Sequence, residues 1–157
     1  MKTPYEFILH LYLNFNMKDA QPFLRDRKNI YRNDFNKWIK NFFNYILLYD
    51  YDEYHRIDRI ILTVHKTFNS VNLSITNEDL IKLINTDETF GASVLKEFFT
   101  ETNLHGFNVK EMYDIESANR IYSLYKNWFL MFNHDPFSFS NEELTNEDKM
   151  NFIHNIL

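Results

Sequence analysis

The scarcity of glycine and proline constrains this chain more than any other feature of its sequence. The 157 residues include only 2 Gly and 3 Pro, against a usual combined share of roughly 12%. These two residues supply the backbone torsions of tight turns, so a β-sandwich with many hairpins is disfavoured. Neither GxGxxG nor GxxxxGKS/T occurs, which makes phosphate binding through either loop unexpected. The chain is therefore expected to be mostly helical.

The N-terminal segment has a complete helix-start signal. Thr3 is a favourable cap, Pro4 occupies the first helical position, and Glu6 can return a hydrogen bond to the cap. The apolar residues that follow recur at spacings of three and four. This pattern predicts a helix with one apolar face that ends near Asn16.

Longer helices are predicted from the same periodicity. The strongest stripe predicts a central packing helix that begins at Asn33 or Asp34. Its members are Phe35, Trp38, Ile39, Phe42, Phe43, Ile46 and Leu47. The longest predicted helix begins at Asn108 and carries apolar residues as far as Phe132, ending before Pro136. Further predicted caps are Thr76, Ser140 and Thr145.

Residues 54–76 allow two interpretations. The apolar residues of 54–68 fit a helix, which we prefer, but residues 60–64 and 71–75 also alternate as strands do. The alternative is a small β-hairpin around residues 60–76. In either case we expect a mostly all-α, single compact domain of six to eight helices that spans residues 1–157.

The composition indicates the class of protein. With 16 Phe, 10 Tyr and 2 Trp the chain can fill a hydrophobic core and is no disordered tail, and the absence of Cys excludes a disulfide framework or a thiolate nucleophile. No segment resembles a membrane span or a secretory signal, so we expect a soluble, cytoplasmic protein. Frequent Asn, Ile, Lys, Phe and Tyr, which have AT-rich codons, are typical of a low-GC genome, its phages and mobile elements, or a large DNA virus.

The formal charge of −5 is unevenly distributed along the chain. Residues 1–75 carry 11 Lys and Arg against 8 Asp and Glu, whereas residues 76–157 carry 6 against 14. The acidic second half would suit a basic partner surface. The alternative is that both halves are simply solvated.

The most unusual stretch is YILLYDYDEYHRIDR, residues 45–59. Tyr49, Tyr51 and Tyr54 cannot all enter one core if the chain turns between them. Together with Arg56 they form a predicted partner-binding site, since tyrosine and arginine are enriched at interface centres; the alternative places the rings along the core edge. We therefore expect a small macromolecule-binding accessory or inhibitory protein of a phage, virus or mobile element. It would act by protein–protein occlusion, with a protein partner or as a homodimer.

The basic segment 25–40 gives the alternative function, a nucleic-acid-binding regulator. Its predicted contacts are Arg25, Arg27, Lys28, Arg32 and Lys37. Two features weigh against it. Trp38 lies within the apolar stripe and is not free to stack on bases, and the acidic remainder of the chain repels a polyanion.

Signatures of catalysis, metals and cofactors are missing from the sequence. GxSxG and HExxH are absent, and no two of the six His are four residues apart. Paired carboxylates such as Asp87-Glu88 stand at predicted helix starts, where the helix dipole favours them. We expect no enzyme activity, no metal and no cofactor.

Overall fold

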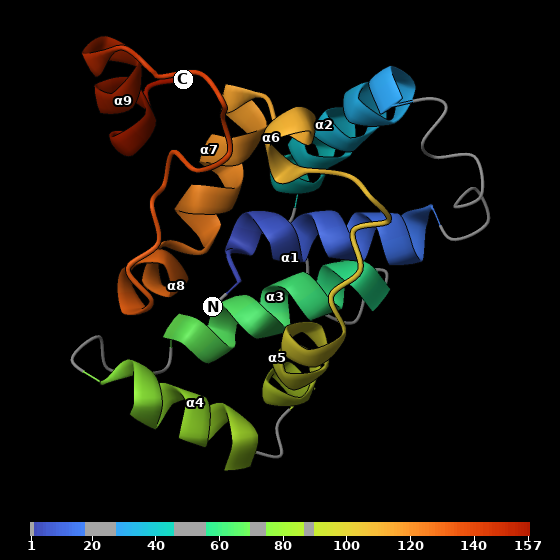
Figure 1. Cartoon of the computed structure of the whole chain (residues 1–157), viewed down its shortest axis with the longest axis vertical. Helices are drawn as coiled ribbons and strands as arrows, with labels where there is room; N and C mark the ends of the chain where they lie inside the picture. The colour runs from blue at the N-terminus through green and yellow to red at the C-terminus, as the bar shows by residue number, and fades with distance from the viewer. Residues whose placement is uncertain (1, 18–27, 46–55, 70–74, 87–89) are drawn as a thin grey trace.

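The computed structural model describes residues 2–17, 28–45, 56–69, 75–86 and 90–157. Within these ranges the chain forms nine α-helices and no strand, and seven of the helices have at least seven residues (Figure 1). The prediction of a mostly all-α fold is confirmed. Of the two interpretations of residues 54–76, the structure shows the helix, because residues 60–69 are helical. The predicted second strand falls largely outside the described residues.

Helix α1 (Pro4–Leu11) crosses the centre of the molecule and is buried over most of its surface (Figure 1). Its start is the predicted capping box: the Glu6 N–H donates to Thr3 Oγ1 (3.3 Å) and the Thr3 N–H donates to Glu6 Oε1 (3.2 Å). The helix continues into one π-helical turn, η1 (Tyr12–Asn16), and the predicted end near Asn16 is confirmed. A helix that is apolar on nearly every side must be covered from several directions.

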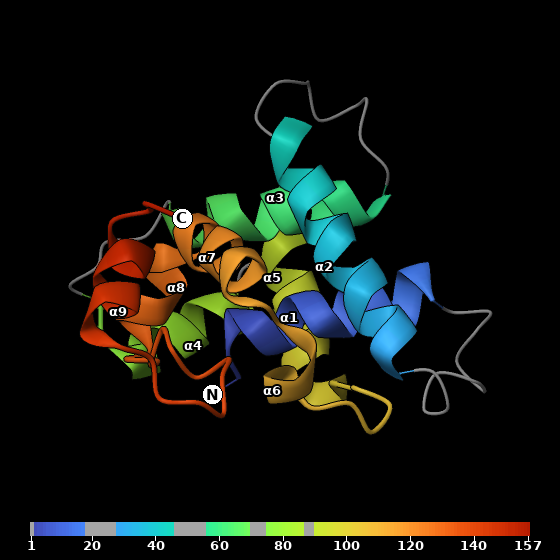
Figure 2. The ribbon, with the colours of Figure 1, turned by 90° about the horizontal axis from the view of Figure 1, so that it is seen from above.

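The described part of the chain forms eight further α-helices. They are α2 (Lys28–Tyr45), α3 (Arg56–Asn69), α4 (Asn77–Thr86), α5 (Phe90–Glu101), α6 (Val109–Met112), α7 (Ile115–Leu124), α8 (Lys126–Met131) and α9 (Asn146–Ile153). Both α1 and α2 pack against α6 and α7, while α3 packs against α5 and α8. Helix α9 packs on α7, and α4 packs on α5 at the edge of the molecule (Figures 1 and 2).

Trp128 of α8 joins several of these helices in one aromatic cluster. Its ring is fully buried and stacks on Phe68 of α3, with ring centroids 4.7 Å apart. Phe7 of α1 and Phe98 of α5 contact the same indole, at centroid distances of 5.5 Å and 6.3 Å. Such ring contacts stabilise the core beyond the area they bury.

A buried asparagine fastens α2 to the junction of α6 and α7. Asn36 Nδ2 donates to the carbonyl oxygens of Arg32 (2.8 Å) and Met112 (2.7 Å), and Asn36 Oδ1 accepts from the Asp114 N–H (3.1 Å). The Ser117 hydroxyl donates to the Asn36 carbonyl (3.4 Å). The amide therefore provides partners for the Met112 carbonyl and the Asp114 N–H, which lie where α6 ends and α7 has not yet begun.

The same junction corrects the prediction of one long helix from Asn108 to Phe132. Asn108 caps as predicted, but the chain is extended at Tyr113 and Asp114 and leaves helical geometry again at Tyr125, so that three helices replace the one. The Asp114 carboxylate accepts from the Ser117 N–H (2.7 Å) and starts α7. Side-chain partners for the backbone thus compete successfully with continued helix.

Two other predicted helix starts are wrong. Asn33 and Asp34 lie inside α2, and the Asp34 carboxylate accepts a hydrogen bond from the Tyr12 hydroxyl instead of capping a helix. Ser140 precedes no helix; its hydroxyl accepts from the Glu142 N–H (3.1 Å) in a bend. The caps predicted at Thr76 and Thr145 are confirmed.

Substitution of Asn36 tests the role of this amide. Asn36→Ala would leave two backbone groups of the α6–α7 junction, the Met112 carbonyl and the Asp114 N–H, without this partner, so we expect the free energy of unfolding to fall by about 2 kcal/mol. Asn41→Ala, on the exposed face of the same helix, should change it by less than about 0.5 kcal/mol. Urea denaturation followed by circular dichroism measures both, and equal stability of the two variants would contradict the assignment.

Candidate functional site

The predicted partner-binding site cannot be located within the described residues. Tyr49, Tyr51 and Tyr54 lie outside them, and Arg56 is the first residue of α3 with its side chain likewise outside the described part. Their role as partner contacts therefore stays a prediction.

The tyrosines that the structure does describe are mostly core residues. Tyr5, Tyr12, Tyr113 and Tyr125 are buried. The Tyr113 hydroxyl donates to the Tyr5 carbonyl (2.7 Å), and the Tyr125 hydroxyl donates to the Ile61 carbonyl (2.8 Å). Burial raises the pKa of the Tyr5 and Tyr113 hydroxyls well above the ordinary value, so both stay protonated donors. In the described part of the chain, the interior absorbs nearly all the rings.

Two of the four described cations of α2 are paired with carboxylates from other elements. Arg25 and Arg27 lie outside the described residues. Lys28 Nζ lies 3.2 Å from Glu111, and Lys40 Nζ lies 2.9 Å from Asp114.

Arg32 and Lys37 are exposed on α2, and both line a polar hollow of about 420 Å³. The hollow is also lined by Asp114 and by the amides of Asn33, Asn36 and Asn41. Four carboxylates, those of Asp34, Glu111, Asp114 and Glu116, stand on or beside this face with its four described cations. The described part of this face therefore carries as many carboxylates as cations, which reduces its attraction for a phosphate backbone.

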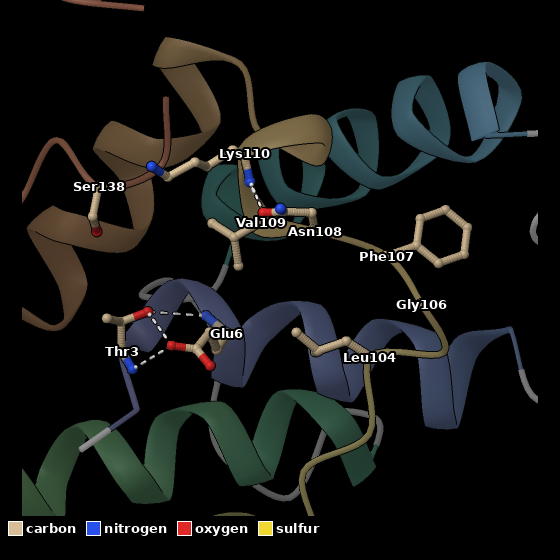
Figure 3. Close-up of a pocket in the computed structure, with 9 residues that line it drawn as sticks. All are labelled: Thr3, Glu6, Leu104, Gly106, Phe107, Asn108, Val109, Lys110 and Ser138. Atoms are coloured by element: carbon tan, nitrogen blue, oxygen red, sulfur yellow. Dashed lines mark hydrogen bonds between the residues drawn. The ribbon is translucent and has the colours of Figure 1, made fainter. Parts of the chain in front are cut away.

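A second hollow, of about 480 Å³, lies between the start of α1 and the segment before α6 (Figure 3). Its polar residues serve helix capping: Thr3 and Glu6 bond to one another, and Asn108 Oδ1 accepts from the Lys110 N–H (3.0 Å). Leu104 and Val109 form apolar parts of its wall. Because these capping groups already have hydrogen-bond partners, helix capping explains why polar residues line this hollow.

A histidine–asparagine network ties the end of α1 to the segment after α5. His10 Nδ1 accepts from the Asn103 N–H (3.1 Å), Asn14 Nδ2 donates to the Asn103 carbonyl (2.7 Å), and His105 Nε2 lies 2.7 Å from Asn14 Oδ1. His10 also lines a small hollow of about 130 Å³ with Glu97 and several apolar residues of α1, α3 and α5. Burial lowers the pKa of His10 despite the nearby Glu97 carboxylate, while His105 and Lys2 also lower it. The neutral imidazole is the form that accepts the Asn103 N–H.

The α4–α5 groove is the most apolar of the candidate sites. It encloses about 470 Å³ between the two helices and is lined by Ile81, Ile84, Asn85, Lys96, Glu97, Phe99 and Thr100. Ile84 is buried and Phe99 contacts Trp128 edge-on (6.1 Å), so the floor of the groove is continuous with the core. Ile81, on the wall, leaves 39% of its surface exposed. Chemically, the groove can bury an apolar side chain of another molecule.

This groove was not predicted from the sequence, although a signal for it exists. Leu80, Ile81, Leu83 and Ile84 are four apolar residues among five, which is more than one buried stripe of a helix requires. Leu80 and Ile84 face the protein interior, whereas Ile81 and Leu83 are left exposed. Such an excess indicates that the helix leaves apolar side chains outside the core.

Among the described residues, no three His, Cys, Asp or Glu side chains gather closely enough to hold a metal ion. No helix in this part of the chain combines the length and apolarity needed to cross a bilayer.

Comparison of the chain with protein families, curated proteins and solved structures finds no match.

Acidification should destabilise the protein through three histidines. Burial lowers the pKa of His10, His65 and His134, so the unfolded chain binds protons that the folded chain does not. Stability from this source is present above about pH 6.5 and is lost as the pH falls below it. Urea unfolding should give a lower midpoint at about pH 5.5 than at about pH 7.5.

Histidine variants control this experiment. His10→Gln should reduce the difference between the two midpoints, whereas substitution of the exposed His154 by Gln should leave it unchanged. A midpoint that rises on acidification would contradict the assignment.

Proposed function

We propose that this protein is a binding module that covers a surface of a partner protein, as an accessory or inhibitory factor, and that the α4–α5 groove is part of its binding surface. One observation carries the proposal: an open groove with an apolar floor, bordered by the exposed side chain of Ile81. Exposed apolar surface bordered by polar residues marks sites of protein association. Helix α4 lies at the molecular edge, where a partner can reach it (Figure 1).

The tyrosine segment is a second element of the proposal. Tyr49, Tyr51, Tyr54 and Arg56 stay predicted contacts on the strength of their residue types alone. A partner could engage this segment and the groove together or separately, and self-association through the same residues would give a homodimer.

Nucleic-acid binding through residues 25–40 has less support. Of its predicted contacts, Lys28 is paired with Glu111, while Arg32 and Lys37 share their surface with carboxylates. Binding to nucleic acid would require Arg25 and Arg27 to supply most of the attraction.

A random peptide library displayed on phage tests the groove without knowledge of the partner. Peptides of about 16 residues, long enough for a helix of about 24 Å, are selected on the full-length protein. We expect selected peptides to bind Ile81→Glu at least about tenfold more weakly than wild type, a loss of about 1.4 kcal/mol, because the new carboxylate must enter the apolar groove.

Leu83→Glu is the matched control. Leu83 lies on the same helix as Ile81, has the same exposed fraction of 39%, and does not line the groove. Its substitution by Glu introduces the same charge as Ile81→Glu. Equal loss in both variants, or no selected peptide that depends on Ile81, would overturn the proposal. Sedimentation of wild type and Ile81→Glu tests the homodimer in the same way.

A further inference from the structure

We infer that the segment bound in the α4–α5 groove is a basic amphipathic helix of the partner protein. The inference rests on the proposed function and adds the chemistry of the occupant. It follows from the charges around the groove and from the shape of its apolar part.

The charges around the groove are predominantly negative. Helices α4 and α5 carry four carboxylates, those of Glu78, Asp79, Glu97 and Glu101, against two lysines, Lys82 and Lys96. Glu97 and Lys96 both line the groove, so the excess comes from Asp79 and Glu101, which are exposed on α4 and α5. Lys82 lies 3.8 Å from Glu78 with both side chains at least 70% exposed, so this pair neutralises little. A segment rich in Lys or Arg would be attracted, and an acidic one repelled.

The apolar part of the groove lies between two neighbouring helices, so it suits a third helix better than an extended chain. Ile81 and Ile84 border it along α4, with Phe99 at its floor on α5. The Thr100 hydroxyl is already used within α5, where it donates to the Lys96 carbonyl (3.0 Å). Extended peptides bind mainly through backbone hydrogen bonds at a sheet edge, which a helical pair does not offer. An amphipathic helix satisfies its own backbone and presents an apolar stripe.

Three synthetic peptides of about 16 residues separate charge from shape. The first has Leu at helical spacing and Lys on the opposite face, the second has Glu in place of Lys, and the third has the composition of the first in a scrambled, non-amphipathic order. Fluorescence anisotropy measures binding to the full-length protein at about 50 mM and about 200 mM salt. Ile81→Glu and Leu83→Glu serve as the test and control variants.

The Lys peptide should bind at least about tenfold more tightly than either of the others, and its affinity should fall several-fold with salt. Ile81→Glu should weaken it about tenfold, and Leu83→Glu less than about threefold. Equal binding of the Lys and Glu peptides would overturn the inference, as would equal binding of the scrambled peptide, which shows attraction by charge alone. If library peptides depend on Ile81 but are not basic, the proposed function stands and this inference fails. If no peptide depends on Ile81, both fail.

Discussion

The burial of α1 is the constraint on which the rest of the structure depends. Its side chains are apolar on nearly every side, and each large one contributes about 1.5–3 kcal/mol when removed from water. Helices α2, α6 and α7 pack together beside it, and Phe7 brings in α5 and α8 through Phe98 and Trp128. Helix α4 joins this assembly through α5, at the edge of the molecule. This placement is why part of its apolar surface is left uncovered.

The sequence was sufficient for features whose causes are local. Capping by Thr3, Asn108 and Thr145 depends on residues within three positions, and these starts were predicted correctly. The break at Tyr113 was not predictable in this way, because it depends on Asn36, which lies 78 positions before Asp114 in the chain and accepts its N–H. The groove escaped prediction for the same reason: apolar spacing on α4 shows how much surface is apolar, but only packing decides which part stays exposed.

The charge pattern acquires a structural meaning from the same packing. Carboxylates of the acidic second half, Glu111 and Asp114, pair with lysines of the first half on α2. Part of the charge difference between the halves is therefore used within the fold, which weakens the case for nucleic acid on the basic segment. The acidic excess of α4 and α5 has only the exposed contact of Lys82 with Glu78 among its described pairs. This acidic excess is the reason that the proposed partner helix is positively charged.

Native-state hydrogen exchange tests most directly the central claim that α1 is the fixed centre and α4 an edge element. Amide protons of α1 should exchange only through global unfolding, at the free energy measured by urea denaturation. Those of α4 should exchange through a local opening of lower free energy, because α4 packs at the edge and keeps apolar side chains exposed. Equal protection of α4 and α1 would show one cooperative unit and contradict the account.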